Sequence, residues 1–157
     1  MIIRLRHMWL GLRLLPSLVG SPQKRSLLRE MYHFCQQLPT ELKRPFPIAL
    51  AHLSTKTISN SNFTSEKQTR ELADLAALLD RRSSLGLCLR RSLTRYYFLR
   101  RLSVPVVVQF GARFVGTEAD RDVTGHAWLI RNGRSYHEID ADWQGFTVMF
   151  SWPQEAA

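Results

Sequence analysis

The sequence predicts an α+β domain in which a cysteine-bearing helix packs against a small antiparallel sheet, with further helices before it. Three observations predict this class. Apolar residues recur at three- and four-residue spacing, the helical period, in several segments before residue 103. After Val104-Pro105 the pattern changes to short β-branched and alternating runs, which are typical of strands. The strands follow the helices instead of alternating with them, which favours an antiparallel sheet.

Length and composition indicate one globular domain with free thiols. The chain has 157 residues, of which 45% are hydrophobic and 22% are charged, a balance that supports a buried core. Two cysteines, Cys35 and Cys88, are too few for the disulfide framework of small secreted domains. We therefore expect a cytoplasmic protein.

The net charge of +9 arises largely from arginines near one predicted helix. They are Arg81, Arg82, Arg90, Arg91, Arg95, Arg100 and Arg101. A solvated helix face explains them, and a basic surface that docks a peptide or nucleic acid is the alternative. No nucleic-acid-binding motif and no zinc-ligand spacing accompanies the charge, so we expect a peptide or protein partner and not nucleic acid.

The N-terminal region is expected to be helical over about residues 2–15 and 24–38. The first stretch looks like a signal peptide, but Arg13 and Pro16 leave it too short to span a bilayer, so no membrane partner is expected. In the second stretch Cys35 falls on the apolar face, which predicts a core position. Three prolines then break the pattern and predict a loop up to about residue 62, namely Pro39, Pro45 and Pro47.

We accordingly divide the chain into an N-terminal helical region with its loop, residues 1–62, and a core, residues 63–157. In the core, Ser65 can cap a helix, because Gln68 three residues later can return the hydrogen bond. Arg81-Arg82 are expected to close its last turn, in favour of the helix dipole. A second helix is predicted from about Cys88 to Leu102.

Four strands are expected after this helix. They are an interior strand over residues 106–110, a hairpin over residues 126–130 and 134–140, and a final strand over residues 146–152. Residues 113–124 are expected to form a surface loop. The hairpin turns at Asn132-Gly133, one of the strongest short turn signals.

Cys88 and His126 predict nucleophilic chemistry. The start of a helix offers free amides and a positive dipole end, which stabilise a thiolate and can donate to an oxyanion. On the predicted strand His126 and Trp128 face one side, while Ala127 and Leu129 face the other. A packed small hydrophobe is the alternative for Cys88, and a core histidine is the alternative for His126.

A carboxylate that orients the imidazole would complete this arrangement. A two-residue turn pairs His126 with Ile139, whereas a three-residue loop sets His126 opposite Glu138. We favour the three-residue loop, because it gives the carboxylate a role, and Asp140 on the same face is the reserve. The other histidines are expected outside the site, and these are His7, His33, His52 and His137.

The pattern of these segments resembles the transglutaminase-like peptidases of lasso-peptide biosynthesis over about residues 70–153. The residues that carry the resemblance are Leu87-Cys88-Leu89-Arg90-Arg91-Ser92-Leu93, Leu99-Arg100-Arg101-Leu102-Ser103-Val104-Pro105, Gly111, Gly125-His126-Ala127-Trp128-Leu129 with Asn132-Gly133, and Phe146-Thr147-Val148-Met149-Phe150 with Trp152-Pro153.

The resemblance implies a papain-like or transglutaminase-like core with a Cys-His-acid triad. Carried over by position, Cys88 is the nucleophile and His126 the base. Glu138 stands where the family most often has aspartate, and Asp140 is the reserve third member. No metal and no organic cofactor is implied.

The resemblance also implies a substrate and partners. The reaction would remove the leader from a ribosomally made precursor peptide. The N-terminal segment has no predicted leading strands of a leader-binding domain, so the stand-alone peptidase is expected. Its partners would be a separate leader-binding winged-helix protein and a cyclase resembling asparagine synthetase. The rival activity is acyl transfer to an amine, which uses the same triad, and a non-catalytic basic binding protein is the rival class.

Overall fold

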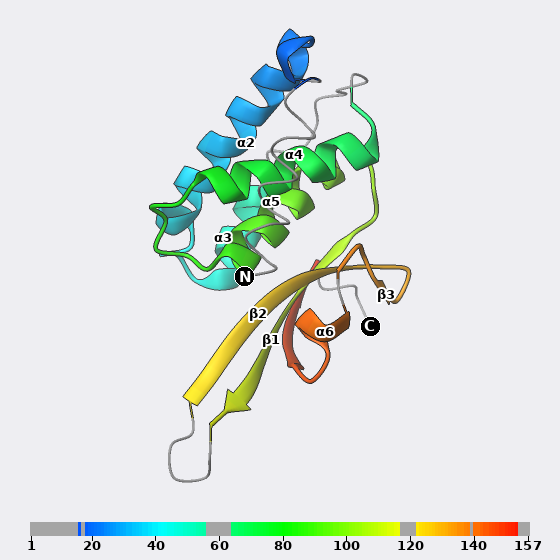
Figure 1. The fold of residues 1–157 in the computed structure, drawn as a ribbon. Helices are drawn as coiled ribbons and strands as arrows, with labels where there is room; N and C mark the ends of the chain where they lie inside the picture. Colours follow the sequence, from blue (N-terminus) through cyan, green and yellow to red (C-terminus); the bar gives the residue numbers. More distant parts are fainter. Residues whose placement is uncertain (1–15, 17, 56–63, 117–121, 139, 154–157) are drawn as a thin grey trace. The chain divides into compact units, whose positions relative to one another are not determined.

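The computed structural model describes residues 16, 18–55, 64–116, 122–138 and 140–153 (Figure 1). The chain forms two compact units, Met1–Val104 and Pro105–Ala157. The first is helical and the second contains the sheet, so the predicted α+β class is confirmed. The helix expected over residues 2–15 and the boundary expected at residues 62 and 63 lie outside the described residues. In the described ranges, no helix has the length and apolar character needed to cross a membrane.

The helical unit begins with α2, Pro22–Glu41, which confirms the helix expected over residues 24–38. Ser21 caps it, and its side chain accepts a hydrogen bond from the Lys24 amide. The helix continues through Pro39, which we had expected to end it. The proline lies in the last turn, so its missing amide affects only the end of the helix, where the Leu42 amide still donates to the Leu38 carbonyl at 2.9 Å.

Helix α3, Phe46–Thr55, occupies part of the segment that we had expected to be a loop. Pro47 is its second residue, where a backbone amide has no helical acceptor in any case. The Pro45 carbonyl accepts hydrogen bonds from the Ile48 and Ala49 amides at 2.9 and 3.0 Å. The two prolines therefore begin a helix here instead of preventing one.

The last two helices of this unit are α4, Glu66–Leu79, and α5, Leu87–Arg101, both close to the predicted bounds. The capping box is confirmed, because the Ser65 side chain accepts from the Gln68 amide at 3.3 Å and the Gln68 side chain returns the bond. We had expected Arg81-Arg82 to close the last turn of α4, but the helix ends before them.

Helices α2, α4 and α5 pack against one another around the core of the unit. Cys35 is fully buried there, as predicted, together with Leu72 and Leu99. Its sulfur lies 3.1 Å from the Thr94 hydroxyl oxygen. Burial raises the pKa of the Cys35 thiol above its ordinary value of 9.0.

Two of the arginines are not solvated, and the prediction of an open charged helix face is wrong for them. Arg90 and Arg95 are only 7% and 4% exposed. Arg95 forms a two-point ion pair with Asp74 on α4, at 2.5 and 2.6 Å. A buried guanidinium needs such a partner, and for Arg90 the partner is Asp80, the residue that follows α4.

The sheet unit contains β1, Val107–Val115, β2, Asp122–Arg131, β3, Arg134–Ser135, β4, Thr147–Trp152, and the short helix α6, Asp140–Trp143. All neighbouring strands are antiparallel, in the order β3-β2-β1-β4, so β1 is interior as predicted. Both ends of the surface loop expected over residues 113–124 are strand, because residues 113–115 pair with residues 122–124, and residues 117–121 lie outside the described ranges.

The hairpin between β2 and β3 has a two-residue turn, so our preferred three-residue loop is wrong. Arg131 pairs with Arg134, and Ile130 pairs with Ser135. The φ angles of Asn132 and Gly133 are 51° and 73°, the left-handed pair that such a turn requires. Strand β3 ends at Ser135, whereas we had expected it to continue to residue 140.

Candidate active site

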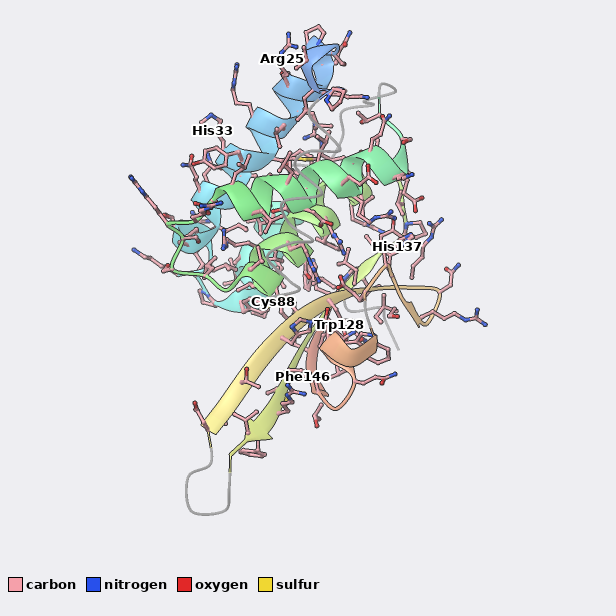
Figure 2. The ribbon with its side chains drawn as sticks, viewed as in Figure 1. Arg25, His33, Cys88, Trp128, His137 and Phe146 are labelled. Carbon is pink, nitrogen blue, oxygen red and sulfur yellow. The ribbon has the colours of Figure 1, made fainter. Side chains whose placement is uncertain are left out.

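Cys88 is the second residue of α5 and follows a glycine N-cap, Gly86 (Figure 2). The helix ladder begins with the Arg90 amide, which donates to the Gly86 carbonyl at 3.2 Å. The amides of residues 87–89 precede this bond, at the end of the helix where amides have no helical acceptor. Cys88 is half-buried with a free thiol, whereas Cys35 is fully buried. Cys88 is thus the thiol that a solute can reach.

His126 lies on β2 beside two aromatic rings. The Trp128 ring stacks beside it, with a centroid distance of 5.9 Å and an interplanar angle of 18°. The Phe146 ring lies 5.3 Å away and comes from the segment before β4. The stack of His126 on Trp128 confirms that these two side chains share one face of the strand, as predicted, and the alternate residues Ala127 and Leu129 are buried. The two rings restrict the orientation of the imidazole.

Gly111 makes room for this stack. It pairs with His126 across β1 and β2. A Cβ at this position would lie 2.7 Å from Cη2 of Trp128 and 2.9 Å from the carbonyl oxygen of Thr147. The sequence contained a signal for this role, because glycine inside a strand often marks a close approach of another group.

Two further residues extend the aromatic cluster around His126, and the sequence did not reveal them. Trp143 of α6 stacks on Trp128 with a centroid distance of 6.3 Å. The Arg113 guanidinium lies over the Phe146 ring, 4.5 Å from its centroid. Helix α6 contacts β2 (Figure 1), so it covers the face of the strand that carries His126.

The two candidate acids follow β3. The Tyr136 amide still donates to the Leu129 carbonyl at 2.8 Å, and His137 then has a φ of 53° and is exposed. Because strand pairing ends here, Glu138 is not the cross-strand partner of His126 that we expected. Glu138 is half-buried, and Asp140 is the first residue of α6. Which of them serves as the acid stays a prediction.

The predicted site residues are divided between the two units. Cys88 belongs to the helical unit, and His126, Glu138 and Asp140 belong to the sheet unit. Within the sheet unit, α6 brings the acidic segment to the His126 face of β2. That the Cys88 sulfur contacts the His126 ring stays a prediction.

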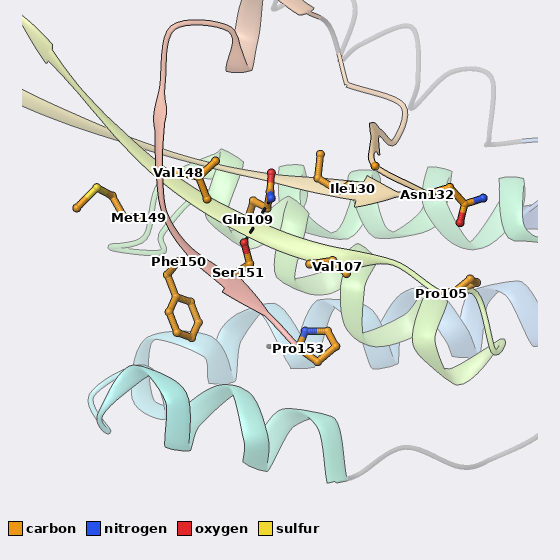
Figure 3. Close-up of a pocket in the computed structure, with 11 residues that line it drawn as sticks. Pro105, Val107, Gln109, Ile130, Asn132, Val148, Met149, Phe150, Ser151 and Pro153 are labelled. Carbon is orange, nitrogen blue, oxygen red and sulfur yellow. Dashed lines mark hydrogen bonds between the residues drawn. The ribbon is translucent and has the colours of Figure 1, made fainter. Parts of the chain in front are cut away.

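An open cavity of about 800 Å³ lies in the sheet unit, and β1, β4 and the β2–β3 turn supply most of its lining (Figure 3). On its wall the Gln109 amide nitrogen donates to the Ser151 hydroxyl at 3.3 Å. Gln109 pairs with Trp128, so its side chain and that of Trp128 share one face of the sheet. The volume falls within the range of small-molecule sites.

Comparison with known proteins gave one result. The family model described as the transglutaminase-like superfamily matches residues 39–151. The matched span includes Cys88, His126 and both candidate acids, and it excludes Cys35. Searches among curated proteins and among solved structures returned no match.

Proposed function

The chain belongs to the transglutaminase-like superfamily, which includes cysteine proteases and transglutaminases, and from this premise we propose that it is a cysteine peptidase. We propose further that it removes the leader from a ribosomally made lasso precursor peptide. One observation carries the choice of nucleophile. Cys88 is the sole cysteine within the matched residues 39–151, and it stands half-buried at the start of a helix.

The proposed reaction proceeds through an acyl-enzyme. His126 takes the proton of the Cys88 thiol, and the thiolate attacks the scissile carbonyl at the junction of leader and core. Amides at the start of α5 are the candidate donors to the oxyanion that forms. His126 then protonates the departing amine of the core peptide. Water, deprotonated by His126, hydrolyses the thioester and releases the leader carboxylate.

Glu138 is the proposed third member, with Asp140 as the reserve. A carboxylate beside the imidazole would hold its tautomer and stabilise the imidazolium during the reaction. The position of α6 against the His126 face of β2 supports an acid from this segment. Comparing the cleavage rates of Glu138→Ala and Asp140→Ala decides between them, because the true third member shows the larger loss.

The proposed partners rest on the resemblance of the Cys88 and His126 segments to lasso leader peptidases. They are a separate leader-binding winged-helix protein, which would present the leader as an added strand, and a cyclase resembling asparagine synthetase. The compartment proposed for this assembly is the cytoplasm. The cavity beside Gln109 offers room for part of a peptide on the sheet face that carries Trp128.

The test is cleavage of a precursor peptide in the presence of the leader-binding partner, read by mass. We expect the wild-type protein to yield separate leader and core masses and Cys88→Ala to yield none while it keeps the wild-type circular dichroism. Cys35→Ala is the matched control and should still cleave, because Cys35 lies in the core outside the matched span. Full cleavage by Cys88→Ala would refute the peptidase assignment.

Acyl transfer to an amine is the second candidate, because the superfamily includes transglutaminases. It uses the same thioester and differs only in the acceptor, an amine in place of water. Adding a primary amine to the cleavage reaction separates the two activities, because transfer adds the mass of the amine to the acyl product. If instead the protein only binds, Cys88→Ala keeps full function, and binding to nucleic acid would weaken steeply with salt.

A further inference from the structure

Arg90 lies two residues after Cys88, in the first turn of α5, and its side chain is buried. Its guanidinium reaches back along the chain. Nε donates to the Leu85 carbonyl at 3.1 Å, and Nη1 donates to the Ala77 carbonyl at 2.7 Å. Nη1 also donates to the Asp80 carbonyl and lies 3.6 Å from the Asp80 carboxylate. One side chain thus joins the end of α4, the α4–α5 loop and the start of α5.

These contacts require an arginine. Ala77 belongs to the last turn of α4 and Asp80 caps it, and carbonyls at a helix end lack donors from within the helix. A guanidinium presents five N–H groups in a rigid plane, so it can serve several carbonyls at once. The buried carboxylate of Asp80, a residue that is 6% exposed, compensates the charge. Lysine would keep the charge, but it has no group equivalent to Nε for Leu85.

The backbone of Arg90 anchors the same turn to the core. Its amide donates to the Gly86 carbonyl at 3.2 Å, and its carbonyl accepts from the Thr94 hydroxyl at 2.7 Å. The Thr94 oxygen in turn lies 3.1 Å from the Cys35 sulfur on α2. The first turn of α5 is therefore tied both to the preceding loop and to the buried core.

Local capping contributes little to this turn. The N-cap is Gly86, which has no side chain to accept a hydrogen bond from the first amides. An uncapped first turn frays, and fraying would move the amides near Cys88 out of line. The contacts of Arg90 with the Leu85 and Gly86 carbonyls hold the two residues before the helix.

We infer that Arg90 is a positioning residue for Cys88: its guanidinium ties the α4–α5 loop to α5 and keeps the first helical turn, with its amides, in place around the sulfur. This inference deepens the proposed function and rests on it, because it assigns Cys88 as the nucleophile. Arg90 does not touch the substrate in this account.

Arg95 provides a matched control on the same helix. It is as deeply buried as Arg90 and is also paired with a carboxylate, but that partner is Asp74 within α4. Arg90→Lys and Arg95→Lys both keep the charge and lose the planar fork. A difference in Cys88 alkylation between the two variants therefore reports where the contacts of the arginine lie, and not the general effect of removing a buried guanidinium.

The experiment measures alkylation of Cys88 by iodoacetamide as a function of pH in the full chain, followed by the mass of the Cys88 peptide. Urea unfolding of each variant runs in parallel. We expect both variants to be less stable and Arg90→Lys alone to slow the alkylation of Cys88, by about threefold at neutral pH. Equal slowing in both variants, or no slowing in Arg90→Lys, would overturn the inference.

A second measurement covers the case in which Arg90→Lys does not fold. In the wild-type protein, the Arg90 amide should be as protected from hydrogen exchange as amides in the middle of α5. Exchange as fast as in an unstructured peptide would also overturn the inference. Neither readout uses the precursor. Cleavage by Cys88→Ala would end the proposed function and leave these results standing, whereas unslowed alkylation in Arg90→Lys would end only the inference.

Discussion

Gly111→Ala should destabilise the sheet unit, because the added methyl group has no space. Its carbon would lie 2.7 Å from Cη2 and 2.9 Å from Cζ3 of Trp128, and 2.9 Å from the Thr147 carbonyl oxygen. Carbon atoms in favourable contact are about 3.5–4.0 Å apart, so the overlap with the indole is close to 1 Å. The indole can tilt only by disturbing its stack with His126, and the Thr147 carbonyl belongs to β4, which pairs with β1.

Overpacking of a core position typically costs about 1–3 kcal/mol of stability. Because the added methyl group meets both the Trp128 ring and the backbone carbonyl of Thr147, we expect a cost of about 3 kcal/mol. That free energy lowers the folding equilibrium constant by about two powers of ten. Urea unfolding followed by circular dichroism measures it. Gly125→Ala is the control, because its Cβ would meet only the Gly111 carbonyl oxygen, at an ordinary 3.9 Å. Equal stability losses in the two variants, or none in Gly111→Ala, would refute the packing argument.

Other predictions concern the helical unit. Above about pH 9 the free energy of unfolding should fall, because burial raises the pKa values of Cys35 and Tyr97, so the unfolded chain releases protons that the folded chain keeps. Urea unfolding at several pH values across this range gives the slope of the free energy of unfolding against pH. Cys35→Ala should make this slope shallower, and an unchanged slope would contradict the raised pKa of Cys35. Ser65→Ala should cost about 1 kcal/mol in urea unfolding through loss of the capping box, and a neutral result would show that the cap is dispensable. In the folded protein iodoacetamide should modify Cys88 long before Cys35, which is fully buried, and equal rates by peptide mass would contradict the burial argument.

The sequence predicted the helices whose apolar period and capping residues can be recognised from neighbouring positions in the chain. Ser65 and Gln68 lie within one turn, and their capping box formed as expected. Helix α3 was missed because proline breaks a helix interior but suits its first turn, and only the position of the helix distinguishes the two. The burial of Arg90 and Arg95 could not be predicted, since it depends on carboxylates that the packing of α4 on α5 supplies.

The register around His126 was predicted wrongly, because we gave the expected role of Glu138 more weight than the turn signal in the backbone. We preferred a three-residue loop because it gave Glu138 a partner, but Asn132 and Gly133 both adopt the positive φ of a two-residue turn. That His126 and Trp128 share one face of β2 was predicted correctly from the strand period. The rings of Trp143 and Phe146 were not foreseen, because α6 and the segment before β4 bring them to β2 from later in the chain.

The most direct test of the central claim is whether the His126 imidazole controls the reactivity of the Cys88 sulfur. His126→Phe keeps a ring beside Trp128 and Phe146 and removes both nitrogens. His137→Asn is the control, because His137 is exposed and asparagine tolerates its φ of 53°. An imidazolium beside the sulfur would stabilise the thiolate, the form that iodoacetamide alkylates. We therefore predict that His126→Phe slows the alkylation of Cys88 at neutral pH by about tenfold or more, while His137→Asn follows the wild type. Identical rates for His126→Phe and the wild type would contradict the pairing of Cys88 with His126.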